Sequence, residues 1–128
     1  MNPRALARLT AAGRIAIGAG FVVSPGVSMR SWLGPEAGRP AVKLLARALG
    51  ARDLVLGVGA LATERKAAAL RGWLAAALVA DATDFLATAA AGDEIPRASR
   101  ALVLGIAGGA CVIGAGAVAA LGSEPPAA

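Results

Sequence analysis

The sequence contains no histidine and no tyrosine, and its single cysteine, Cys111, has no second thiol to pair with. These absences exclude haem ligation by histidine, zinc sites built on histidine or paired cysteines, Ser-His catalysis, tyrosine general acids and an intramolecular disulfide. We therefore expect no metal and no cofactor, and we expect Cys111 to have a packing role. Any proton chemistry must come from carboxylates, lysine or arginine.

Aromatic residues are also scarce, at 3%, whereas 57% of the 128 residues are apolar and the mean hydropathy is +0.66. Residues 101–121 contain no charged residue, and about 18 to 20 such residues suffice to cross the hydrocarbon core of a bilayer. A soluble protein of this length has too few large side chains to enclose so long an apolar helix. The composition therefore places the chain among integral membrane proteins.

Four apolar segments are long enough to form helices, and they span residues 5–23, 41–63, 70–91 and 98–121. The longest connection, residues 24–40, is rich in proline and glycine, which argue against a continuous helix. Trp32 in this connection is expected to anchor a short turn at the level of the lipid headgroups. We predict an all-α fold: a single domain over residues 1–128, with four antiparallel transmembrane helices in a bundle and a flexible tail at 122–128.

Basic residues outnumber acidic ones, thirteen to eight, for a formal net charge of +5. They lie at segment ends and within spans, without aromatic interleaving, so we expect membrane lipids and no nucleic acid as partners. The basic N-terminus resembles a secretory signal, but no small-residue cleavage site is obvious, which favours a retained first helix. Arg4 and Arg8 favour cytoplasmic termini. We expect the protein to be integral to the plasma (inner) membrane.

Six charged residues lie inside the apolar segments, where an ionisable side chain costs at least about 2.5 kcal/mol and normally faces a partner. They are Arg14, Arg47, Arg52, Asp53, Asp81 and Asp84. Asp81 and Asp84 are three residues apart and share a helix face, which Thr88 continues. Asp53 lies between Gly50 and Gly57, on a narrow face that can meet a neighbouring helix.

Depth in the bundle and helix face predict three ion pairs among these residues: Arg47 with Asp84, Arg52 with Asp81, and Arg14 with Asp53. One interpretation is a closed network that only fixes the register of the helices. In the alternative, the network is incomplete, and one of two close carboxylates is protonated or accepts a bound ion or amine. The six residues are then the candidate binding site.

Small residues recur at four-residue spacing in three segments and predict close helix packing within the chain, with a homodimer face as the alternative. These residues are Ala12, Ala16 and Gly20 in the first segment, Ala46 and Gly50 in the second, and Ala101, Gly105 and Gly109 in the fourth.

Three stretches of the chain are similar to a family of small four-helix integral membrane proteins that is common in actinobacteria and has no assigned function. They are WLGPEAGRP at residues 32–40, LLARALGARDLVLGVGA at 44–60 and RGWLAAALVADATDFLAT at 71–88. The resemblance spans most of residues 14–121 and implies the four-helix topology. The positions that match the family's motifs are Arg47, Arg52, Asp53, Asp81 and Asp84. The resemblance implies no substrate.

Three functions fit these features. The first is a module that binds a lipid or another apolar ligand, or an accessory subunit of a larger membrane complex. The second is a small membrane enzyme, an isomerase, cyclase or hydrolase of a lipophilic substrate, with Asp81 or Asp84 as catalytic acid/base and Arg47 or Arg52 stabilising an oxyanion. The third is a dimeric proton-coupled exporter of cations.

Overall fold

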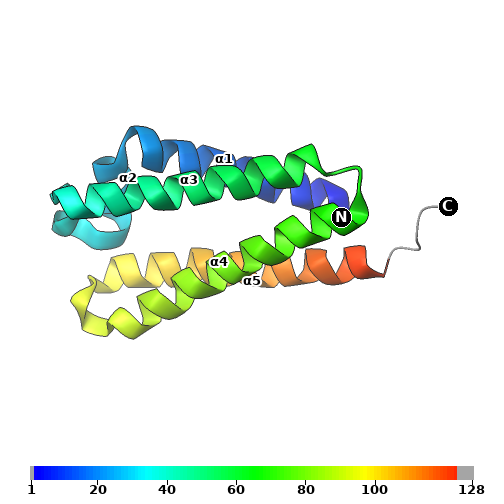
Figure 1. Cartoon of the computed structure of the whole chain (residues 1–128). Helices are drawn as coiled ribbons and strands as arrows, with labels where there is room; N and C mark the ends of the chain where they lie inside the picture. The colour runs from blue at the N-terminus through cyan, green and yellow to red at the C-terminus, as the bar shows by residue number, and fades with distance from the viewer. Residues whose placement is uncertain (1, 124–128) are drawn as a thin grey trace.

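The computed structural model describes residues 2–123, and these residues are almost entirely helical (Figure 1). Four long helices are α1 (Pro3–Val23), α3 (Pro40–Ala62), α4 (Ala67–Ala91) and α5 (Arg97–Gly122). A short helix, α2 (Pro25–Leu33), precedes the 3-10 turn η1 (Gly34–Gly38), and a second turn, η2 (Gly92–Glu94), follows α4. The all-α class is confirmed. Of the predicted tail, Gly122 belongs to helix α5 and Ser123 caps it, while residues 124–128 lie outside the described residues.

Proline and glycine mark several helix boundaries. Helices α1, α2 and α3 each begin with proline, whose fixed φ suits the first helical position, where no backbone N–H is needed. Helices α2 and α4 each end before a glycine with positive φ, Gly34 at 58° and Gly92 at 54°. Glycine adopts this left-handed backbone at no steric cost, which terminates the helix.

The connection at residues 24–40 differs from the prediction. Residues Pro25–Leu33 form helix α2 where a short turn was expected. Pro25 starts this helix because it occupies the first position, so the proline that separates α2 from α1 does not prevent a new helix. Met29 and Ala37 pack with Ala46 of α3 in a small buried cluster, and Trp32 lies partly buried against it.

The long helices form two closely packed pairs. Helix α1 lies along α3, and α4 lies along α5, while α3 and α4 connect the pairs and α1 touches α5 much less (Figure 1). Helices α1 and α3 occupy one half of the view and α4 and α5 the other, with α2 at one end. Helix α1 begins and α5 ends at the same end of the molecule.

Small residues allow α1 and α3 to approach, although not all of the predicted ones take part. Ala46 and Gly50 of α3 are buried as expected, but α1 meets α3 through Gly18 and the backbone of Ala11. The small residues predicted to pack on α1 and α5 are instead mostly accessible, and four of them line a pocket between these helices: Ala16, Gly20, Gly105 and Gly109. Their spacing places them on one face of each helix, and that face borders the pocket. Gly20 also approaches α2, because a Cβ built on it would lie 3.3 Å from Oγ of Ser28.

Three helical segments are long and apolar enough to cross a membrane: Pro3–Val23, Ala67–Glu94 and Arg97–Gly122. Helix α3 has 23 residues, but every stretch of spanning length within it contains Arg47, Arg52 and Asp53. Helix length and composition therefore support three of the four predicted spans. Whether α3 also crosses the membrane depends on how its charged residues are paired.

Candidate functional site

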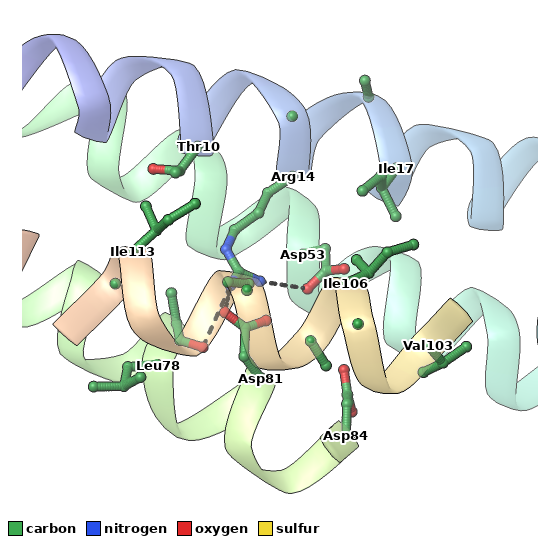
Figure 2. Close-up of a pocket in the computed structure, with 18 of the residues that line it drawn as sticks. Thr10, Arg14, Ile17, Asp53, Leu78, Asp81, Asp84, Val103, Ile106 and Ile113 are labelled. Atoms are coloured by element: carbon green, nitrogen blue, oxygen red, sulfur yellow. Dashed lines mark hydrogen bonds and ion pairs between the residues drawn. The ribbon is translucent and has the colours of Figure 1, made fainter. Parts of the chain in front are cut away.

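Arg14 lies at the centre of the charged cluster. Its side chain leaves α1 and points between α3 and α4 (Figure 2). One guanidinium nitrogen donates to Oδ1 of Asp53 at 3.2 Å, and the other donates to Oδ2 of Asp81 and to the carbonyl oxygen of Ala77 at 3.4 Å. A single side chain thus joins three helices, which a planar group with several N–H donors can do.

Arg52 makes the second set of ion pairs. Its two terminal nitrogens donate to the two oxygens of Asp84, at 3.0 and 2.8 Å, in the forked geometry typical of strong arginine–carboxylate pairs. The same guanidinium also donates to Oδ1 of Asp53, at 3.2 and 3.3 Å. Asp53 therefore accepts from both arginines and links the two halves of the cluster.

The predicted pairings are only partly correct. The pair of Arg14 with Asp53 is confirmed. The pair of Arg52 with Asp81 is wrong, because Asp84 takes Arg52 and Asp81 takes Arg14. Asp81 and Asp84 share a face but differ in height by about 4.5 Å along α4. A shift of one helical turn between α3 and α4 is enough to exchange the partners.

Arg47 does not belong to the cluster, so its predicted pair with Asp84 is wrong. It lies five residues before Arg52, a rotation of about 140° around the helix, and therefore points from a different face. The side chain is exposed and forms no ion pair within residues 2–123. It lines a second, shallow concavity of about 400 Å³ together with Arg30 and Lys43.

The clustered carboxylates are buried to different degrees. The side chain of Asp53 is 9% exposed and that of Asp81 12%, whereas the side chain of Asp84 is 18% exposed. Thr88, at 1%, continues the face of the two aspartates as predicted, and its hydroxyl donates to the carbonyl oxygen of Asp84 at 2.7 Å. The polar groups are thus held in position by three helices.

A pocket of about 900 Å³ opens beside the cluster, between α1 and α5 (Figure 2). Most of its lining is apolar, including Ile17 from α1, Leu78 from α4 and Ile106 and Ile113 from α5. Trp32 of α2 also lines the pocket. The charged residues in the lining are Arg14, Asp53, Asp81 and Asp84. This arrangement is typical of sites for apolar ligands, in which a few polar groups set the orientation of the ligand.

The cluster contains more carboxylates than guanidinium groups. Two arginines, Arg14 and Arg52, face three aspartates, so the cluster carries one excess negative charge when every group is ionised. Within residues 2–123, no set of three metal-ligating side chains lies in a position to hold a metal ion. A monovalent cation, an amine or a proton is the simplest partner for this excess.

The pocket was not predicted from the sequence. Its apolar lining residues look like any others in a membrane span, and periodicity does not distinguish a residue that faces a pocket from one that packs. The available signal was the row of small residues on the first and last segments, which we assigned to packing. No family model, curated protein or solved structure matches this chain, so its resemblance to the actinobacterial family stays a prediction.

Proposed function

We propose that this protein is a small integral membrane protein that binds one apolar ligand in the pocket between α1 and α5. The proposal includes a four-helix antiparallel transmembrane bundle in the plasma (inner) membrane, with both termini in the cytoplasm. The observation that carries the proposal is the pocket of about 900 Å³, because its apolar walls end at a charged cluster. A ligand would bury its chain or ring against the walls and direct a polar group at the cluster.

The distribution of side chains supports a lipid environment for all four long helices. Buried positions include Asp53 and Asp81, whereas many large aliphatic side chains are exposed. Helix α3 alone exposes Leu44, Leu45, Val55 and Val58. In water so much exposed apolar surface would be costly, whereas acyl chains would cover it. The pairing of Arg52 and Asp53 with residues of α1 and α4 supports α3 as the fourth span, since embedded charges need partners.

Native mass spectrometry of the protein released from its own membranes tests this function. We expect one non-protein mass per copy of the wild-type chain. Gly109 lines the pocket and has no atom within 4 Å of a Cβ built on it, so Gly109→Leu adds a side chain that starts in open space at the pocket wall. Gly116, on the same helix, is equally unobstructed but lies outside the pocket lining.

The bound mass should therefore be lost from Gly109→Leu and kept by Gly116→Leu. A wild-type chain that carries no bound mass would contradict the proposal. So would a bound mass that both variants retain equally. If the mass is instead a second protein, the chain is better described as a subunit of a larger membrane complex.

A membrane enzyme is the second candidate, and the observation that favours it is that Asp81 and Asp84 both line the pocket. Asp81 is the better acid/base of the two, because both oxygens of Asp84 accept from Arg52. Arg14 would then stabilise an oxyanion, because neither Arg47 nor Arg52 lines the pocket. Conversion of the released ligand by the wild-type protein and its loss in Asp81→Asn, with the fold intact, would support an enzyme over a binding module. The third candidate, a dimeric proton-coupled exporter, would instead produce pH-dependent cation flux in proteoliposomes.

A further inference from the structure

We propose that the ligand of the α1–α5 pocket is a lipophilic amine, whose protonated nitrogen binds at Asp53 and Asp81 while its apolar body fills the pocket. This inference rests on the proposed function and specifies the chemical class of the ligand. It is carried by three observations: the charge balance of the cluster, the hydrogen-bonding state of individual carboxylate oxygens, and the position of those carboxylates in the pocket lining.

The charge balance predicts the sign of the ligand. Asp53, Asp81 and Asp84 line the pocket, whereas Arg14 is the one cationic residue in its lining. Arg52 neutralises part of this charge through Asp84 and Asp53. The remaining excess of one negative charge favours a ligand that brings one positive charge and disfavours an anionic headgroup.

Individual oxygen atoms show where the cation would bind. Both oxygens of Asp84 accept from Arg52, so each already has a cationic partner. Asp53 uses Oδ1 for both arginines, and Asp81 uses Oδ2 for Arg14. Oδ2 of Asp53 and Oδ1 of Asp81 receive no hydrogen bond from the described residues. Neither atom is fully buried, so both can be reached by a ligand. An ammonium group has three N–H donors and no acceptor, which suits two accessible carboxylate oxygens.

The apolar walls explain why the amine must also be lipophilic. A small hydrated ammonium ion would fill little of a pocket of about 900 Å³ and would leave its apolar lining without a partner. A chain or ring system contacts Ile17, Leu78, Ile106 and Ile113 while the nitrogen reaches the carboxylates. A proton on one carboxylate is the competing way to balance the charge, and it would remove the preference for an amine.

Tryptophan fluorescence offers a direct test, because Trp32 lines the pocket and Trp73 packs instead against Gly59 of α3. In a Trp73→Phe background, Trp32 is the only tryptophan in the chain. The protein is placed in nanodiscs of zwitterionic lipid and titrated with three probes that share one nitroxide-labelled alkyl chain: a primary amine, an alcohol and a sulfate. Quenching of Trp32 then reports binding of the chain in the pocket.

We expect the amine to bind about 10- to 100-fold more tightly than the alcohol, the range that a charged hydrogen bond supplies, and the sulfate to bind most weakly. Gly109→Leu should abolish saturable quenching by all three probes, and Gly116→Leu should preserve it. Asp81→Asn keeps an oxygen that accepts from Arg14 but removes the excess charge, and it should reduce the preference for the amine to about twofold or less.

The outcomes separate this inference from the proposed function. Equal affinity for amine and alcohol, with both lost in Gly109→Leu, would leave a binding pocket but overturn the choice of an amine. An amine preference that persists in both Asp81→Asn and Asp53→Asn would overturn it as well. If no probe gives saturable quenching, the proposed function is overturned as well. The same holds if a second copy of the chain closes the pocket. If the aspartate variants do not fold, the wild-type comparison of amine with alcohol still decides the inference.

Discussion

Gly18 of α1 and Gly50 of α3 face each other so closely that neither position has room for a side chain. A Cβ built on Gly18 would lie 2.7 Å from the carbonyl oxygen of Gly50, and one built on Gly50 would lie 2.6 Å from the carbonyl oxygen of Gly18. Both obstructing atoms belong to the backbone, so they cannot move without shifting a helix. This contact sets the distance from which Arg14 reaches Asp53.

The first prediction concerns this contact. Gly18→Ala should destabilise the protein by about 1–3 kcal/mol, the usual cost of overpacking a tight interface. The free energy of unfolding can be measured by titration with sodium dodecyl sulfate in lipid–detergent bicelles. Gly13→Ala on the same helix is the matched control, because no atom lies within 4 Å of its added Cβ. It should be neutral or stabilising by up to about 1 kcal/mol, owing to helix propensity. Equal effects of the two substitutions would contradict the close approach of α1 and α3.

The second prediction concerns Arg14, which joins α1 to α3 and α4. Arg14→Met should cost about 3–5 kcal/mol, because it leaves two buried carboxylates without their shared cation. The same unfolding titration measures this loss. Arg8→Met is the control on the same helix, since the Arg8 side chain is 61% exposed in its pair with Glu64 and should contribute less than about 1 kcal/mol. A loss for Arg14→Met no larger than that for Arg8→Met would show that the cluster does not hold the helices together.

The third prediction tests which aspartate pairs with Arg52. A double-mutant cycle with Arg52→Gln and Asp84→Asn should give a coupling energy of about 1–3 kcal/mol, because the two side chains share two hydrogen bonds. The cycle of Arg52→Gln with Asp81→Asn is the comparison and should give a clearly smaller value, since these side chains form no ion pair among the described residues. The reverse order of the two coupling energies would restore the pairing expected from sequence.

The fourth prediction concerns Arg47, which the sequence placed in the cluster. Because its side chain is exposed and lies with Arg30 and Lys43, Arg47→Ala should change the free energy of unfolding by no more than about 0.5 kcal/mol. Arg52→Ala, five residues along the same helix, should cost several times as much. Unfolding titrations of both variants provide the measurement, and a loss above about 2 kcal/mol for Arg47→Ala would place Arg47 in a network that these contacts do not contain.

Part of the site could be predicted because it depends on properties of single helices. The spacing of Asp81 and Asp84, and the narrow face around Asp53, follow from a rotation of about 100° per residue, whatever the helices pack against. The pair of Arg14 with Asp53 could also be predicted from the sequence, since both residues lie near the middle of neighbouring segments. The separation of Arg47 from the cluster could not be predicted from depth, because Arg47 lies near the height of Asp84 but projects from a different face of its helix than Arg52.

The amino-acid sequence by itself determined the helical class, the approximate bounds of the long helices and the identity of the charged residues embedded in them. These features are local: apolar length, proline at helix starts and glycine at helix ends act within a few residues of the chain. Only the tertiary structure decided that Asp84 takes Arg52, that Arg47 stands apart and that a pocket opens between α1 and α5. Those outcomes depend on the height and separation of one helix against another, which the close contact of Gly18 with Gly50 and the pairing of distant charges establish together.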